Sequence, residues 1–318
     1  MKKVSQVLLL TVLPQLIFAQ SYPHFTMFMF NKLLYNPAYA GNKDLTEVNA
    51  YYRDQWTGID GAPKTMSVSI DGPAGSYMSS FRKVALGLSV SYEKLGVTTF
   101  NNINAYYAYR IPMRKSVLSF GLQAGGSIYS AHLSDLNPYQ PNDQVISQNV
   151  SNRFLSNFGT GIYWRGERFY AGAAVPNLLE NYYSKDHMNT DGASNKQIRI
   201  YYLSGGYVFS LSDDLKLEPQ AFFRYAGDVN ANLPMNADVN LSLIIYDRLL
   251  IGATYRTDGS VEGIVHMQVT NELNIGYAYD YTVSYLKNYN YGTHEITIGF
   301  DFIKDRNKYI NPRFVKLF

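Results

Sequence analysis

From residue 45 onward the sequence alternates with period two between apolar side chains and small or polar ones. This is the pattern of a β-strand whose two faces meet different surroundings. The clearest stretch is 273–284, and the stretches 118–128 and 295–301 repeat it. The second face carries mainly Gly, Ser, Asn, Gln and Thr, whereas a soluble β-sandwich usually exposes Lys and Glu there. An apolar face turned to lipid and a polar face turned to a crowded lumen account for this composition. The pattern therefore predicts an all-β fold, a single antiparallel outer-membrane β-barrel over residues 45–303.

Turn residues divide this region into about 14 strands, many of them near the roughly 9 to 11 residues that a membrane strand needs. The predicted strands are 46–56, 64–72, 84–93, 100–110, 117–129, 154–165, 168–175, 196–210, 215–225, 238–246, 249–257, 261–269, 273–284 and 294–302. Short connections (166–167, 211–214, 247–248 and 271–272) alternate with long ones (130–153, 176–195, 226–237 and 285–293). Outer-membrane barrels place their short turns in the periplasm, so an even strand number would leave both termini there.

The start of the chain has the composition of a secretory signal peptide. Lys2 and Lys3 precede an apolar run over 7–18, and Ala19 is a small residue suited to cleavage. The run is shorter than the ~20 residues of a membrane helix, and Pro14 interrupts it, which disfavours a retained anchor. We therefore expect residues 1–19 to direct export to the outer membrane of a Gram-negative bacterium and to be removed near Ala19.

The aromatic content supports a membrane location without proving it. The chain has 29 Tyr and 17 Phe, but only 17% of its residues are charged. Tyr has an apolar ring and a polar tip, so it collects in the aromatic girdles of outer-membrane barrels. A soluble, Tyr-rich β-sandwich would have the same composition. The chain has no Cys, which excludes disulfides and thiolate metal sites, and its net charge of +3 gives no reason to expect nucleic acid as a partner.

No motif predicts catalysis, a metal site or a cofactor. The segment 58–65 superficially resembles a phosphate-binding loop, but Pro63 removes a backbone N–H that the loop needs, and a strand pattern follows it. His266 and His294 alternate with apolar neighbours and are expected to face the lumen. A Ser–His pair of a membrane hydrolase there is an alternative that needs a spatial partner.

Charged residues of both signs are expected to line the lumen. They are Glu93, Arg110, Arg165, Arg199, Glu218, Arg224, Arg256 and Glu262. Such mixed charges across a narrow lumen more often brace and plug it than select a solute. Asp135, Asn142 and Asp143 offer oxygen ligands in a long loop, but their spacing does not match a calcium loop, so a solvated loop is favoured.

The strongest local signal precedes the first predicted strand and continues into the first hairpin. The segments 20–31 (QSYPHFTMFMFN), 34–41 (LYNPAYAG), 52–56 (YRDQW) and 58–63 (GIDGAP) together resemble the opening of the PorP/SprF family of type IX secretion system membrane proteins. The segment 311–314 (NPRF) is similar to that family's ending. Tyr22 departs from the acidic residue common in the family, and the chain continues to Phe318.

The resemblance implies a 14-stranded outer-membrane barrel that works with the type IX machinery. It implies that partners are components of the periplasmic ring, or a secreted adhesin or other substrate with a type B C-terminal domain. Some members of the family serve gliding motility. The alternative function is a passive channel for small hydrophobic solutes.

The segment 20–44 and the first hairpin hold the candidate partner-binding residues, and a tail is expected over 304–318. The candidates are Phe25, Phe28, Phe30, Asn31, Tyr35, Asn36, Pro37, Tyr39, Gly41, Arg53, Trp56, Gly58, Gly61, Pro63, Arg313 and Phe314. The aromatic segment is expected on the periplasmic side, either as a partner-binding surface or as a plug in the barrel mouth. Pro37 fixes φ, and Gly41 permits a turn into the first strand. The hairpin is expected to form a structural turn or a contact for the exported protein at the rim.

Overall fold

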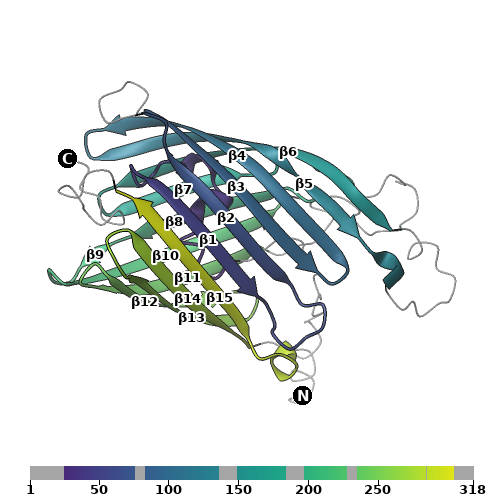
Figure 1. Cartoon of the computed structure of the whole chain (residues 1–318). Coiled ribbons are helices and arrows are strands. Elements are labelled where there is room, and N and C mark those ends of the chain that lie inside the picture. The colour runs from purple at the N-terminus through teal and green to yellow at the C-terminus, as the bar shows by residue number, and fades with distance from the viewer. Residues whose placement is uncertain are drawn as a thin grey trace, which may run out of the picture.

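The computed structural model describes residues 25–75, 83–135, 149–183, 197–227, 235–283 and 285–303, which form an antiparallel β-barrel (Figure 1). The predicted signal peptide 1–19 and the tail 304–318, with Arg313 and Phe314, lie outside the described residues, as do Asn142 and Asp143. Within the described part of the chain, no helix is long and apolar enough to cross a bilayer.

The regular elements are strands and short 3₁₀ helices. The strands are β1 Thr46–Asp54, β2 Lys64–Pro73, β3 Val84–Leu95, β4 Thr98–Met113, β5 Ser116–Ala131, β6 Val150–Gly166, β7 Phe169–Val175, β8 Ile200–Tyr207, β9 Phe209–Ser210, β10 Leu215–Ala226, β11 Asn236–Ile245, β12 Leu249–Arg256, β13 Ser260–Gln268, β14 Leu273–Thr282 and β15 Thr293–Phe302. The helices are η1 Lys32–Leu34, η2 Pro37–Tyr39, η4 Leu133–Asp135 and η6 Tyr285–Asn288.

The sheet closes on itself, because β15 pairs with β1 and β10 pairs with β11. The two-residue strand β9 is an addition at the edge of β10, so the closed barrel has 14 strands. The prediction of an all-β, antiparallel barrel of about 14 strands is confirmed. We call the end that carries the β4–β5, β6–β7 and β11–β12 turns the short-turn mouth, and the opposite end the long-loop mouth.

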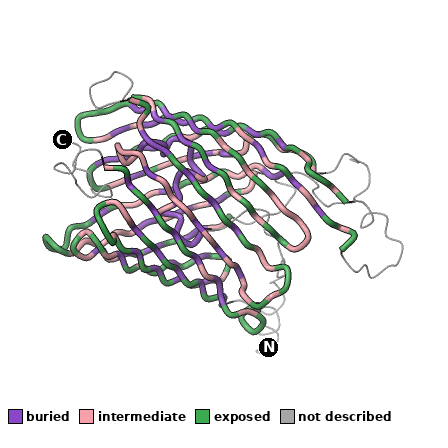
Figure 2. Tube along the Cα trace, in the orientation of Figure 1, coloured by how far each residue is buried: buried purple, intermediate pink, exposed green. Residues whose placement is uncertain are grey.

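Buried and exposed residues alternate along the strands (Figure 2). The exposed residues are mainly apolar and the buried ones mainly polar. In β2, Met66, Val68 and Ile70 are 47%, 54% and 42% exposed, while the three polar residues that alternate with them are at most 7% exposed. Because the polar residues point inward, the apolar face has no protein to cover it and suits lipid. The interpretation of the period-two alternation as an apolar outer face and a polar inner face is therefore confirmed.

Two differences from the predicted strands have clear causes. The stretch 196–210 is divided in the structure, since Val208 leaves the ladder and donates its N–H to the Arg168 carbonyl at 2.7 Å. Strands β4, β5 and β6 run for 16, 16 and 17 residues, beyond the turn residues that were expected to end them. These three strands stay paired with one another beyond their predicted ends, so this part of the sheet extends further at the long-loop mouth.

Residues 25–45, here called the plug, lie inside the barrel. The plug contains η1 and η2, and the side chain of Asn36 caps η2 by accepting a hydrogen bond from the Ala38 N–H at 3.0 Å. Pro37 occupies the first position of η2, where its missing N–H costs nothing. Gly41 then adopts a positive φ of 67° and donates its N–H to Asp71, which turns the chain toward β1.

Candidate functional site

The aromatic residues of the plug form the apolar core of the lumen. Phe28 is fully buried and stacks on Phe222 of β10 with ring centroids 5.1 Å apart. Tyr35 packs against the same ring at 4.6 Å, and Phe30 stacks on His266 of β13 at 4.0 Å. Each fully buried side chain of this size contributes roughly 1.5–3 kcal/mol by leaving water. The plug is therefore packed into the barrel as a core rather than resting loosely in its mouth.

The Asn-Pro-Ala block of the plug fits against a wall of glycines. The amide of Asn36 donates to the Ile162 carbonyl of β6 at 3.1 Å. A Cβ atom on Gly121 of β5 would overlap the backbone of Ala38, and one on Gly161 would overlap the side chain of Asn36. These positions need glycine because the plug backbone approaches the barrel wall so closely.

A network of buried charges lies toward the long-loop mouth. This long-loop cluster consists of Arg53, Arg224, Arg256, Asp238, Glu262, Asp280 and Glu295, all buried. Arg256 contacts Asp238 at 3.0 Å and Glu262 at 2.7 Å. Arg53 contacts Glu295 at 2.8 Å and Asp280 at 3.4 Å. The cluster braces seven strands of the wall, as expected of charges of both signs across a narrow lumen.

The same cluster holds the start of the plug. The Glu295 carboxylate accepts hydrogen bonds from the backbone N–H groups of Thr26 at 2.8 Å and Met27 at 2.6 Å. The guanidinium of Arg53 also donates to the Thr26 hydroxyl at 2.6 Å. Phe25, Phe28 and Tyr35 thus lie inside the barrel, with Phe25 toward the long-loop mouth, so the aromatic segment has the arrangement of a plug rather than that of an exposed surface.

The end of the plug is held at the short-turn mouth by a second group of charges. Lys43 pairs with Asp301 at 3.1 Å and with Glu47, while Asp44 pairs with Arg165 at 3.0 Å and with Arg110. We call these six residues the short-turn cluster. They fix the point at which the plug leaves the lumen and enters β1.

Both plug charges are stabilised in their ionised forms. Burial alone would raise the pKa of Asp44, but the guanidiniums of Arg110 and Arg165 outweigh it and hold the pKa below its usual value. Burial would likewise lower the pKa of Lys43, and the carboxylates of Glu47 and Asp301 instead raise it. Lys43 and Asp44 are therefore both charged throughout the neutral range.

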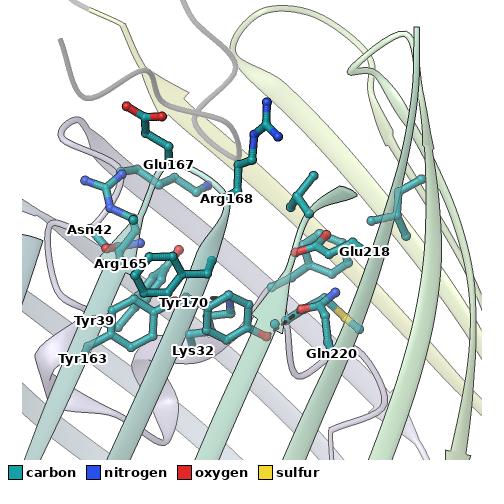
Figure 3. A pocket seen from close by; sticks show the side chains of 18 of the residues that line it. Lys32, Tyr39, Asn42, Tyr163, Arg165, Glu167, Arg168, Tyr170, Glu218 and Gln220 are labelled. Atoms are coloured by element: carbon teal, nitrogen blue, oxygen red, sulfur yellow. Dashed lines mark hydrogen bonds between the residues drawn. The ribbon is translucent and has the colours of Figure 1, made fainter. Parts of the chain in front are cut away.

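A pocket opens at the short-turn mouth beside the β6–β7 turn, and Lys32 of the plug forms part of its floor (Figure 3). The ammonium of Lys32 lies 3.3 Å from the centroid of the Tyr170 ring and 3.4 Å from the Tyr163 hydroxyl. A cation over an aromatic face is attracted by the ring quadrupole, which offsets part of the cost of burying Lys32. Glu167 and Arg168 lie at the exposed edge of the pocket.

The hairpin between β1 and β2 is tied to its neighbours at the long-loop mouth. Thr57 exchanges two backbone hydrogen bonds with the β14–β15 connection, donating to Gly292 at 2.9 Å and accepting from Tyr291 at 2.8 Å. The carbonyl of Gly61 accepts from Gly96 in the β3–β4 turn at 2.8 Å. Gly58, with a φ of 99°, leaves room for the Tyr291 ring. The hairpin is thus a structured part of the rim.

The candidate residues fall into two groups in the structure. The buried group comprises Phe25, Phe28, Asn31, Tyr35, Asn36, Pro37, Tyr39, Gly41 and Arg53, with Phe30 half-buried beside them. The rim group comprises Trp56, Gly58, Gly61 and Pro63. Among the described candidates, the rim group lies at the surface of the long-loop mouth, while Phe30 and Tyr39 line the pocket at the short-turn mouth.

Several residues of the charge clusters, and Asp71 beside Gly41, were not singled out from the sequence. Asp44, Glu47, Asp71, Asp238, Asp280, Glu295 and Asp301 belong to this group. For those that lie in strands, the position on the polar face of the period-two alternation is the sequence signal that could have identified them. Among the predicted lumen charges, Glu93, Arg199 and Glu218 belong to neither cluster. Arg199 donates to the Leu178 carbonyl near the rim at 2.7 Å, while Glu93 and Glu218 each line a pocket of the lumen.

Two histidines were expected to face the lumen, and one of them does. His266 faces the lumen, where its ring bonds to Asn274 at 3.1 Å. The prediction for His294 was wrong: its neighbours in β15 point inward, so its own ring lies on the outer face and bonds to the Tyr277 hydroxyl at 2.8 Å. Among the described residues, no group of His, Cys, Asp and Glu is arranged to hold a metal ion.

A closed barrel with apolar strands outside and a built-in plug inside defines a membrane β-barrel protein. The sequence matches the model of the family described as type IX secretion system membrane protein PorP/SprF over residues 17–300. The chain belongs to the PorP/SprF family, as its opening motifs indicated. No curated protein matches the sequence.

Solved structures with a similar fold are also membrane barrels. The CymD monoaromatic hydrocarbon channel aligns with a TM-score of 0.51 at 10% identity, covering 86% of this chain and 92% of that chain. The NanC porin aligns with a TM-score of 0.40 at 9% identity, covering 81% of this chain and 99% of that one. A mutant porin of Rhodopseudomonas blastica aligns with a TM-score of 0.36 at 8% identity, covering 81% and 100%. At these identities the likeness concerns the fold alone.

Proposed function

We propose that this chain is an outer-membrane component of the type IX secretion system that docks or retains a secreted protein at its long-loop mouth. In this proposal the short turns face the periplasm, and the short-turn mouth contacts the periplasmic ring. The secreted partner carries a type B C-terminal domain and is an adhesin or a similar surface protein, which would also allow a role in gliding motility.

The observation that carries the proposal is the plug, which is fixed to the wall at both mouths. Glu295 binds its first residues and Asp301 pairs with Lys43 near its end. With its lumen occupied in this way, the barrel offers surfaces for other proteins at its two mouths rather than a conduit between them. The chain's membership of a type IX secretion family supports the identity that we propose for those partners.

The rim of the long-loop mouth has the side chains of a protein-binding surface. Tyr289 and Tyr291 of the β14–β15 connection are 74% and 78% exposed, and Trp56 of the tied hairpin lies on the same rim. Tyr and Trp dominate the binding energy of protein interfaces, because they bury large areas at a small entropic cost. We assign the docking of the secreted partner to this rim.

The proposal gives the chain no catalytic role. The lumenal His266 is stacked on Phe30 and bonded to Asn274, and His294 lies on the outer face. Both histidines therefore have structural contacts that account for their positions.

Affinity purification from crosslinked outer membranes tests the proposal. The unaltered chain should recover one secreted protein together with ring components. Replacing both Trp56 and Tyr291 with Ala should lower recovery of the secreted protein roughly 5- to 30-fold, the effect of losing about 1–2 kcal/mol of binding energy. Tyr246→Ala is the matched control, because Tyr246 is 68% exposed but lies in a turn at the short-turn mouth.

Equal recovery by the rim variant and the unaltered chain would contradict docking at this rim. A triple variant with Phe28, Phe30 and Tyr35 replaced by Ala asks whether the plug itself binds a partner. Since these side chains pack against the wall, we expect the triple variant to lower thermal stability first. Loss of recovery without any loss of stability would instead assign partner binding to the plug.

The alternative of a channel for small hydrophobic solutes makes a different prediction. A plugged barrel should show no stable open state when purified and placed in a planar bilayer. A steady single-channel conductance in the unaltered chain would favour the channel over the docking role.

A further inference from the structure

A second cavity lies inside the barrel toward the long-loop mouth, between the plug and the wall formed by β2 to β8. It is bounded on the plug side by Phe25, Leu34 and Tyr35. Its volume of about 120 Å³ leaves room for up to about ten water molecules, and thus for one small polar ligand. The proposed docking at the rim makes no use of this cavity.

Aromatic rings form two parts of its lining. On one part Tyr202 of β8 stacks on Phe222 at 5.5 Å, beside Tyr35. On the other part Phe100 of β4 lies edge-on to Tyr183 at 5.9 Å. Ring faces of this kind offer flat apolar surfaces to a ligand whose own faces carry C–H groups.

The rest of the lining is made of neutral amides and hydroxyls. These residues are Thr65, Ser89, Ser91, Asn102, Asn104, Gln123, Ser127, Asn157, Asn177 and Gln197. Among the described residues that line the cavity, Glu93 alone carries a formal charge. The strongly charged groups of the lumen are gathered in the two clusters instead. A lining of this composition disfavours an ion and favours a neutral ligand rich in donors and acceptors.

One lining atom points to a missing partner. The Oε1 atom of Gln123 is buried and accepts no hydrogen bond in the structure, and the Gln123 side chain as a whole is 6% exposed. A buried acceptor left unpaired destabilises the folded protein, and a ligand hydroxyl that donates to it would remove that cost. Neighbouring polar groups are already ordered, as the Asn102 amide donates to the Ser91 hydroxyl at 3.0 Å.

We propose that this cavity binds a neutral saccharide, with one sugar ring against the aromatic residues and its hydroxyls bonded to the amides. A sugar ring presents C–H groups on its faces and hydroxyls around its edge. Each hydroxyl both donates and accepts a hydrogen bond, as the Asn and Gln side chains do. An anion would lose its hydration without gaining a counter-charge in this lining, and a cation would find one carboxylate, that of Glu93, among the described lining residues.

The experiment uses the full mature chain in lauryldimethylamine oxide, a detergent without a sugar headgroup. D-glucose, N-acetyl-D-glucosamine and maltose are the probes, and binding is measured by saturation-transfer NMR and by titration calorimetry. We expect at least one probe to bind the unaltered chain. Gln123→Leu should weaken that binding at least about tenfold while leaving the thermal stability unchanged or raised, because the buried acceptor had no partner to lose.

Gln220→Leu is the matched control, since Gln220 is also a buried lumen-facing glutamine but lines the pocket at the short-turn mouth. It should leave sugar binding unchanged. The proposal is overturned if none of the three probes binds at about 20 mM, or if Gln123→Leu and Gln220→Leu weaken binding equally. It is also overturned if the neutral tetrapeptide Gly-Asn-Ser-Gly binds in a Gln123-dependent way and the sugars do not. None of these results depends on the secreted partner, so they are separate from the test of docking.

Discussion

At the long-loop mouth the plug is held through its backbone, whereas at the short-turn mouth it is held through its own charged side chains. The wall supplies Glu295 at the first end, and the backbone N–H groups of two plug residues bind it. At the second end the plug supplies Lys43 and Asp44, and the wall supplies Asp301 and Arg165 as partners.

The two ends of one segment are therefore fixed by different kinds of contact. A backbone N–H is present whatever side chain occupies the plug, so the long-loop end depends mainly on the wall. The short-turn end depends on both partners and on their ionisation. The two ends should therefore respond differently to substitutions and to pH.

The largest effect is expected from Glu295→Ala. The change removes the acceptor of two plug N–H groups and leaves the buried Arg53 without its nearest carboxylate. Breaking a buried charge pair in this way costs about 3–5 kcal/mol. The measurement is the unfolding midpoint of the detergent-purified barrel. Glu295→Gln is the control, since it keeps one acceptor and should lose less; equal loss would show that charge alone matters.

A smaller effect is expected from Asp44→Ala at the other end. Arg110 and Arg165 would lose their shared carboxylate, but Asp44 is partly exposed, so water can solvate them in part. We expect a loss of about 2 kcal/mol, less than for Glu295→Ala. Proteolysis at the short-turn end of the plug should become faster. A loss as large as that of Glu295→Ala would remove the contrast between the two ends.

Acid should weaken the short-turn end, because protonation of Asp44 removes the carboxylate that Arg110 and Arg165 share. The pKa of Asp44 lies below its usual value of 3.8 in the folded protein, so its contribution is complete above that pH and is lost as pH falls through the folded pKa. The pKa of Lys43 is raised above its usual value of 10.5, so its contribution is complete below that value and is lost only in stronger alkali.

The measurement for this prediction is the melting temperature of unaltered protein and Asp44→Asn between pH 7 and pH 3. The difference between the two proteins should be constant near neutrality and shrink below pH 3.8. A difference that does not change over the whole range would contradict the role of Asp44 ionisation.

The smallest effect on stability is expected at the rim. Trp56→Ala should change the unfolding free energy by about 1 kcal/mol or less, since Trp56 is half-buried on a hairpin that backbone hydrogen bonds hold in place. Thermal denaturation measures this. A loss comparable to that of Asp44→Ala would mean that Trp56 is a structural residue rather than a docking one.

The strands and their faces could be predicted because they depend on local alternation. In β14, Ile275, Tyr277 and Tyr279 were expected on the apolar face, and they are exposed in the structure. Strand ends were less predictable where a partner strand extends the pairing, as in β4 to β6. The family was likewise indicated by short motifs at fixed positions.

The place of the plug could not be derived in the same way. The contact between Thr26 and Glu295 joins residues 269 positions apart, and no local pattern encodes it. The alternation over 295–301 places Glu295 on the polar face, but its function depends on which segment fills the lumen. His294 shows the converse case, since its alternation with Thr293 and Glu295 was sufficient to place it outside the lumen.

Hydrogen–deuterium exchange of the purified barrel tests the central claim most directly. If the plug is packed in the lumen, the backbone N–H groups of Thr26, Met27 and Gly41 should exchange as slowly as those of β1, since each is bonded to a buried carboxylate. Complete exchange of residues 26–41 at the earliest time point, with the strands still protected, would contradict the account.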